Sequence, residues 1–109
     1  MNTINLDTIL DVSEDAPIRG RHQVLANLME EVGELAVCIN RPYKATEPLI
    51  GEAADVINCV IDIIWLDYIH SYEADGRTYE EARFDIAYAL KEQLEKKCAK
   101  WRKSFEEPK

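Results

Sequence analysis

The chain has 109 residues, enough for one domain with an apolar core of its own. Hydrophobic residues make up 47% of it and charged residues 31%, while 13 Lys and Arg against 21 Asp and Glu give a formal net charge of -8. This charge argues against nucleic-acid binding, which needs a basic surface. No apolar run reaches the roughly 18 residues of a membrane span and no signal-peptide pattern opens the chain, so we expect a cytoplasmic protein with no membrane partner.

The pattern of the chain predicts an all-α helical bundle in a single domain over residues 1–109. Only four glycines and four prolines interrupt it, and no alternating strand pattern is present. A short helix is expected from Leu6 to around residues 13–17, where acidic residues and Pro17 break the period. A second helix is expected from about Arg21 to Ile39, because apolar residues recur there at spacings of three and four. They are Val24, Leu28, Val32, Leu35 and Ile39.

Two further helices are expected in the second half of the chain. Thr46 is predicted to cap a helix that runs to about His70, with Glu47 and Pro48 in its first turn. Residues 71–77 are predicted to form a loop. Thr78 and Glu81 then have the spacing of a capping box that opens the last helix. The apolar stripe of that helix contains Tyr79, Ala82, Ile86, Leu90, Leu94, Cys98 and Trp101.

The segment from Ala53 to Leu66 predicts an oligomer. Only Asp55, Asn58 and Asp62 are polar within it, so neighbouring helices or a second subunit should enclose it on most sides. Three main helices cannot surround it and also leave room for a substrate, so we expect a homodimer or a homotetramer built as a dimer of dimers. The three cysteines, Cys38, Cys59 and Cys98, have no zinc-binding spacing and are expected to be buried, reduced thiols.

Carboxylates gather on one side of each of the two middle helices. Glu30, Glu31 and Glu34 fall within an arc of roughly 100° on the first of them. On the next helix, spacings of three, three and four form a second polar stripe of Glu52, Asp55, Asn58 and Asp62. Either acid pair alone is typical of a surface salt-bridge face or of helix-dipole complementation. Together, on helices with strong apolar patterns, they favour a divalent-cation site, and an all-oxygen ligand set suits Mg²⁺ or Mn²⁺.

Residues 30–35, Glu-Glu-Val-Gly-Glu-Leu, and residues 52–57, Glu-Ala-Ala-Asp-Val-Ile, resemble the E-E-x-x-E … E-x-x-D signature of MazG-like nucleoside triphosphate pyrophosphohydrolases. The resemblance covers about residues 19–70. It implies an all-α fold in which helices from different subunits complete the active sites. It also implies Mg²⁺-dependent hydrolysis of nucleoside triphosphates, dCTP or dATP for example, to the monophosphate and pyrophosphate. Mn²⁺ would substitute for Mg²⁺, and the role would be to cleanse the nucleotide pool.

The resemblance assigns roles by position. Metal binding falls to Glu31, Glu34, Glu52 and Asp55, and catalysis to Glu30, Glu31 and Glu34. The chain departs from the pattern seven residues after Asp55, where many relatives carry Asn and this chain carries Asp62, with an Asn earlier at Asn58. Both are candidate substrate-binding residues, as are His22 and Lys44, for which a solvated surface position is the alternative.

Two other functions compete with this interpretation. One is a non-catalytic helical dimer that binds a protein partner through its basic last helix. The other is a ferritin-type di-iron bundle, which needs Glu-x-x-His pairs. The chain offers only Asp67-x-x-His70 for such a pair, so the sequence disfavours the di-iron site.

Overall fold

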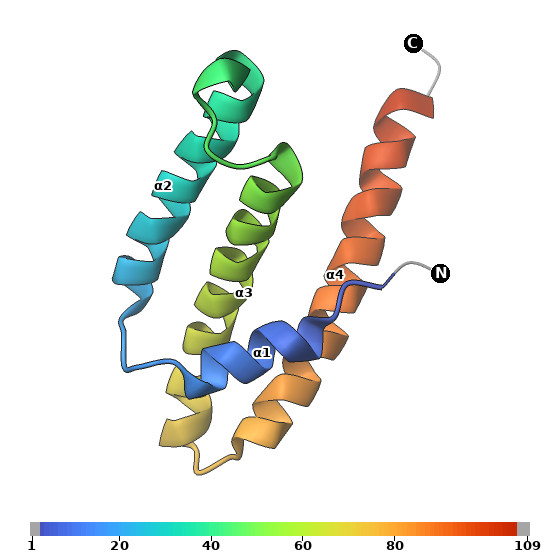
Figure 1. The fold of residues 1–109 in the computed structure, drawn as a ribbon. Helices are drawn as coiled ribbons and strands as arrows, with labels where there is room; N and C mark the ends of the chain where they lie inside the picture. Colours follow the sequence, from blue (N-terminus) through green and yellow to red (C-terminus); the bar gives the residue numbers. More distant parts are fainter. Residues whose placement is uncertain (1–2, 107–109) are drawn as a thin grey trace.

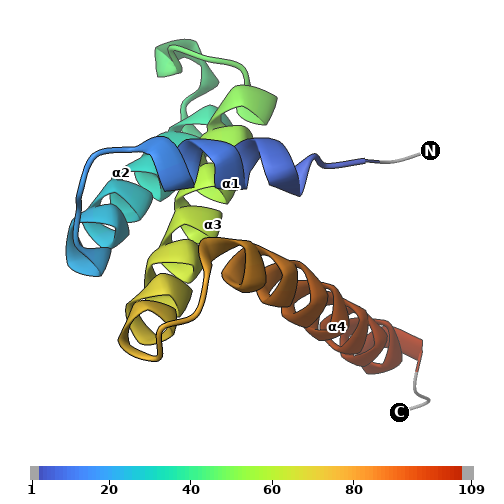
Figure 2. The same cartoon turned by 90° about the horizontal axis from the view of Figure 1, so that it is seen from below.

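A computed structural model describes residues 3–106 and is all-helical over that range. Helices α2 and α3 form an antiparallel hairpin, α1 crosses one side of α3, and α4 starts at the lower end of the hairpin and diverges from it (Figures 1 and 2). The all-α class is confirmed. The elements are α1 (Leu6–Asp15), α2 (Arg21–Asn40), the 3₁₀ turn η1 (Pro42–Lys44), α3 (Leu49–Ala74) and α4 (Tyr79–Glu106).

Helix α3 is the element whose boundaries differ from expectation. It begins at Leu49 with Pro48 as its N-cap, so Thr46 does not cap it and Glu47 lies in the preceding loop. It also continues through residues 71–74, which were predicted to be loop. No Gly or Pro interrupts that stretch, and Tyr72 packs against the core. The helix ends only at the Asp75-Gly76 turn, where Gly76 has a φ of 70°.

The start of α4 follows the predicted capping box. The backbone N–H of Glu81 donates to Thr78 Oγ1 at 3.1 Å, and the backbone N–H of Thr78 donates to Glu81 Oε1 at 3.1 Å. The bond from the Thr78 backbone, followed by the one from Arg77, lowers the pKa of Glu81. Two otherwise unpaired backbone donors are therefore satisfied reciprocally.

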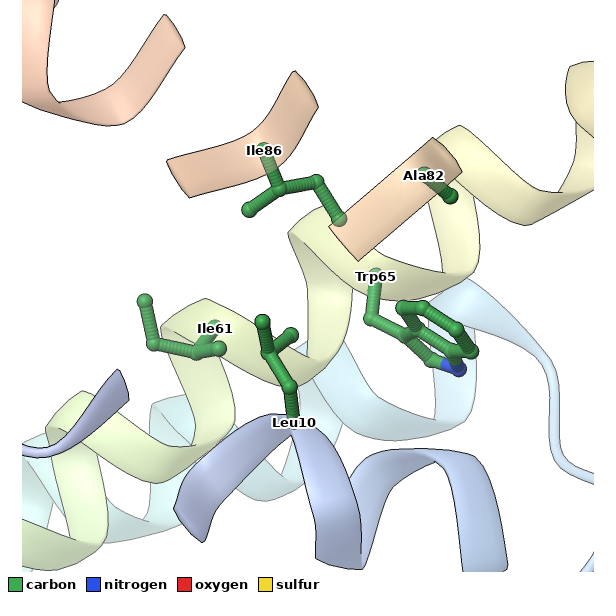
Figure 3. Packing of buried hydrophobic residues seen from close by; sticks show 5 residues of the cluster. All are labelled: Leu10, Ile61, Trp65, Ala82 and Ile86. Carbon is green, nitrogen blue, oxygen red and sulfur yellow. The ribbon is translucent and has the colours of Figure 1, made fainter. Parts of the chain in front are cut away.

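The core joins α1, α3 and α4 at one end of the hairpin. It consists of Leu10, Ile61, Trp65, Ala82 and Ile86 (Figure 3). The indole of Trp65 is almost fully buried and meets the ring of Tyr79 edge-on, with centroids 5.2 Å apart. Trp65 is therefore a core residue. Ile61 and Trp65 follow Asp55 by six and ten residues along α3, which separates the core from the carboxylates.

Several apolar positions predicted to face a core are exposed. They include Val32 and Ile39 on α2 and Leu94 and Trp101 on α4. The prediction of buried thiols is wrong for Cys98, which is exposed, while Cys38 and Cys59 are half-buried. The exposed residues among these lie on helix faces that the rest of residues 3–106 leaves open to solvent. Among the helices described, none has the length and hydropathy needed to cross a membrane.

Candidate metal centre

Three carboxylates converge where the second half of α2 runs beside the first turns of α3. One oxygen each from Glu31, Glu52 and Asp55 lies within 4.8 Å of the others. Glu31 comes from α2 and the other two from α3, so the antiparallel hairpin brings the two sequence motifs together. Three of the four residues to which the resemblance assigns metal binding therefore have carboxylate oxygens close enough together to hold one cation.

The centre holds negative charge that the described residues leave uncompensated. The side chain of Glu52 is buried, with 2% of its surface exposed. Glu52 Oε1 and Glu31 Oε2 are shielded from solvent and have no hydrogen-bond partner among residues 3–106. Buried polar atoms are nearly always paired, so two orphaned carboxylate oxygens side by side need an explanation. Either a bound cation or retained protons would satisfy these two oxygens.

The same crowding raises the pKa of two of the acids. The pKa of Glu52 rises to about 8, first because its protonated carboxyl can hydrogen-bond to Glu47, and then because of burial and the nearby Glu34 carboxylate. The pKa of Glu31 is raised by burial, and further by the negative charges of Glu34 and Asp55. Without a cation, the centre therefore retains protons that isolated carboxylates would release.

Glu47 is a member of this cluster that the sequence did not predict. It was expected in the first turn of a helix, but it lies in the loop before α3 and its side chain folds back over Gly51. A Cβ atom at position 51 would lie 3.3 Å from Glu47 Oε1. The thiol of Cys38 donates to the backbone oxygen of Glu47 at 3.6 Å and connects this loop to α2. The sequence feature that could have identified Glu47 is an acidic residue followed by a glycine, Gly51, shortly before the Glu52-x-x-Asp55 motif.

The remaining acids of the first motif occupy different positions. Glu34 is exposed, but its charge acts on both Glu31 and Glu52, so it lies at the edge of the centre. Glu30 is also exposed and is not part of the converging trio. The structure therefore separates the three acids assigned to catalysis into one inside the centre, one at its edge and one outside it.

The two basic candidates lie apart from the trio. His22 is exposed and precedes Glu31 by nine residues, which places it about 180° around α2 and roughly 13 Å along the helix axis. The structure thus does not bring His22 to the carboxylates. Lys44 ends the 3₁₀ turn between α2 and α3, at the end of the hairpin that carries the centre, and is exposed.

A hollow of about 300 Å³ lies next to the centre, between α1 and the hairpin. Asn27 and Asn58 line it, four residues before Glu31 and three residues after Asp55, so it begins about one helical turn from the trio. Cys59 also lines it, and the pKa of its thiol is raised by burial and by the charges of Glu31, Asp62 and Asp55. The amides of Asn27 and Asn58 offer donors and acceptors inside a mostly apolar wall.

Asp62 also lines the hollow, but its carboxylate is already paired. Arg19 Nε donates to Asp62 Oδ2 at 2.9 Å, and Arg19 Nη2 donates to the other oxygen. Nη2 also donates to the backbone oxygen of Ser13 at 2.9 Å, and Nη1 to that of Pro17 at 3.0 Å. Arg19 therefore connects the end of α1 and the following loop to α3. Sequence analysis did not identify this role, because Arg19 lies 43 residues from its partner.

Replacing Asp62 with Asn is expected to destabilise the fold. The substitution removes the charge from a bidentate ion pair whose side chains are only 16% and 18% exposed. Hydrogen bonds to charged groups contribute about 2 kcal/mol each, so the free energy of unfolding should fall by about that amount. Urea denaturation followed by circular dichroism measures it. The matched substitution Asp67→Asn affects an exposed pair with Arg21 and should change little. Equal effects of the two variants would contradict this role for Arg19.

Comparisons of the chain with protein-family models, with curated proteins and with solved structures give no match. The support for a function therefore comes from the carboxylate centre, the hollow beside it and the sequence signature.

Proposed function

We propose that the protein is a Mg²⁺-dependent nucleoside triphosphate pyrophosphohydrolase. The observation that carries the proposal is the convergence of Glu31, Glu52 and Asp55 with two buried, unpartnered carboxylate oxygens. The centre presents oxygen ligands only, which is the ligand set that Mg²⁺ and Mn²⁺ prefer. The paired E-E-x-x-E and E-x-x-D motifs support the same assignment.

The trio would hold the cation, with Glu34 and Glu47 at its margin. When bound, Mg²⁺ neutralises the triphosphate and lowers the pKa of a coordinated water. Five carboxylates without a cation would repel a triphosphate, so substrate binding should depend on the metal. This dependence explains how a chain of net charge -8 can accept an anionic substrate.

We assign the role of general base to Glu34, which the resemblance also counts among the metal ligands. It lies beside the trio and keeps an exposed carboxylate that can accept a proton from water. The water oxygen forms a bond to the α-phosphorus, and the bond from that phosphorus to the oxygen bridging to the β-phosphate breaks. The proton passes to Glu34, and the products are the nucleoside monophosphate and pyrophosphate. No covalent intermediate on the protein is required.

The hollow between α1 and the hairpin is the proposed place for the nucleoside. It begins about one helical turn from the trio, so one ligand could reach both. Its apolar wall suits a base or sugar face, and Asn27 and Asn58 can hydrogen-bond to polar edges.

The activity is tested with purified protein and each ribo- and deoxynucleoside triphosphate in turn, with Mg²⁺ present. We expect the monophosphate and pyrophosphate in equal amounts, loss of activity with EDTA, and its recovery with Mg²⁺ or Mn²⁺. Release of orthophosphate alone, or no hydrolysis of any of these substrates, would contradict the proposal.

A second candidate is the non-catalytic interaction module. It is favoured by the second half of α4, where Leu94, Trp101 and Phe105 are exposed beside several lysines. Thermal unfolding with Mg²⁺ and a nonhydrolysable deoxynucleoside triphosphate separates the two functions. A ligand at 100 times its Kd stabilises the native state by about 2.7 kcal/mol, whereas a module without a nucleotide site would show no shift.

A further inference from the structure

A second hollow, of about 550 Å³, lies at the end of the hairpin away from the carboxylate centre. Its walls are the end of α1, the connection to α2, the second half of α3 and the start of α4. Trp65 lines it and follows Asp55 by ten residues, which places the two roughly 15 Å apart along α3. The volume of this second hollow falls within the range of small-molecule sites.

The second hollow contains a buried N–H group without a partner. The side chain of Trp65 is 1% exposed, and its indole nitrogen lies on the side of the ring that faces away from Ala82 and Ile86 (Figure 3). Among residues 3–106 this N–H has no acceptor, and its nitrogen is not sealed from solvent. Because a buried indole N–H usually has a partner, this one favours a bound molecule that offers a hydrogen-bond acceptor.

Two arginines line the second hollow, but each is already paired with an aspartate. Arg19 is held by Asp62, and Arg21 Nη1 lies 2.6 Å from Asp67 Oδ1. Arg19 also lines the hollow beside the carboxylate centre, so its ion pair forms part of the partition between the two hollows. Neither arginine brings an unmatched positive charge to the second hollow.

Two carboxylates on one wall of the second hollow are only weakly neutralised. Glu73 Oε1 accepts a hydrogen bond from the hydroxyl of Tyr79 at 2.5 Å. Glu14 Oε1 is 4.0 Å from Arg83 Nη1, whereas the other terminal nitrogen of Arg83 is 2.7 Å from Asp11. The pKa of Tyr79 is raised by its bond to Glu73, by burial, and further by the charges of Glu73 and Glu14, so both acids act at one point. This wall therefore favours a positively charged group.

The rest of the second hollow is largely apolar. Leu66 and Ile69 are half-buried on α3, and Ile18 is exposed in the connection between α1 and α2. An apolar group that lay against these three side chains would remove their remaining surface from water, which is favourable.

We propose that the second hollow binds a small organic cation, an ammonium group on an apolar body that also carries a carbonyl oxygen. The ammonium group would pair with Glu14 and Glu73, and the carbonyl oxygen would accept from the N–H of Trp65. A nucleoside triphosphate has the opposite charge and does not fit this site. The site is thus independent of the reaction at the carboxylate centre.

The probe for this site is phenylalaninamide at pH 6, below the pKa of its amine, and N-acetylphenylalaninamide is its uncharged counterpart. NMR resolves the indole N–H signals of the two tryptophans, and Trp101→Phe assigns them. The Trp65 signal should shift as phenylalaninamide binds, while that of Trp101, which is 71% exposed, should not. The acetylated probe should bind about tenfold more weakly, the loss expected for one charged hydrogen bond. An unmoved Trp65 signal would overturn the site, and equal affinities of the two probes would overturn the cationic ligand.

A pair of variants tests the acidic wall. Glu73→Gln keeps an oxygen that can accept from Tyr79 but removes the charge, so phenylalaninamide should bind severalfold more weakly. Glu80→Gln makes the same change at an exposed position in the first turn of α4, outside the second hollow, and should leave the affinity unchanged. Equal affinities of the two variants would show that the probe does not contact Glu73 and would refute the assignment of this wall.

Discussion

Glu52→Gln is expected to lower Mg²⁺-dependent hydrolysis of nucleoside triphosphates by at least about 100-fold, because even residues that merely support a metal ligand cost 10–100-fold when replaced. Glu52 is the most buried of the converging acids, and its Oε1 has no partner among the residues described. An amide keeps the shape of the side chain but removes the anionic oxygen that would bind the cation. The measurement is kcat at saturating substrate together with a Mg²⁺ titration.

The choice of Gln separates a functional loss from misfolding. With its pKa at about 8, Glu52 is mostly protonated at neutral pH in the metal-free protein, and Gln resembles that neutral form. The variant should therefore keep the helical content and the melting temperature of the metal-free wild type at pH 7. Glu92→Gln makes the same change at an exposed position on α4 and should keep full activity. Full activity in Glu52→Gln would show that the reaction does not use the carboxylate centre.

The metal-free protein is expected to lose stability as the pH rises from about 5 to 8. In the unfolded chain Glu52 releases its proton near its ordinary pKa of 4.5, whereas in the folded chain it keeps the proton until the pH approaches 8. The folded state thus binds more protons in this window, and a state that binds more protons is disfavoured as protons are removed. The raised pKa of Glu31 acts in the same direction.

The measurement is the melting temperature at several pH values in chelator-treated buffer. Glu52→Gln removes one of the two groups that produce this slope, so its melting temperature should vary less with pH than that of the wild type. A wild-type melting temperature that rises between pH 5 and 8, or a variant with an unchanged slope, would contradict the raised pKa of Glu52.

The same protons should leave when the metal binds, because only the ionised carboxylates are ligands. At pH 7 we expect the release of roughly one proton per Mg²⁺. Titration calorimetry in two buffers with different ionisation enthalpies detects it as a difference in the observed heat. Identical heats in both buffers would mean that the cation binds elsewhere or that the centre is already ionised.

Local patterns predicted most of the fold and part of the site. The spacing of apolar residues located α1 and α2, and the Thr78-x-x-Glu81 box located the start of α4. The acids of each motif are spaced three or four residues apart, so each set lies on one side of a helix. A short connection makes consecutive helices antiparallel neighbours, so the approach of Glu31 to Asp55 could be anticipated. Such patterns involve residues that are only a few positions apart, so they can be recognised in a single sequence.

The rest depended on contacts between distant residues or on a loop conformation. Arg19 pairs with Asp62 across 43 residues, and nothing in the local sequence of either predicts the other. Glu47 lies near the other acids because α3 begins at Leu49 and not directly after Thr46, the predicted cap, which leaves Glu47 in the preceding loop. The apolar stripes predicted that helix faces such as the one carrying Val32 pack against another part of the protein. Periodicity does not show whether the packing partner belongs to the same chain or to another chain.

The separation of the core from the carboxylates places the two ends of the hairpin under different selective constraints. Ile61 and Trp65 hold one end in a packed cluster where few side chains fit, whereas the acids at the other end are bounded by a loop and a shallow hollow. Under the proposed function, substitutions of Asn27 and Asn58, which are both exposed, would alter which nucleoside is accepted at little cost in folding. Such an arrangement allows substrate preference to diverge among descendants while the scaffold is conserved.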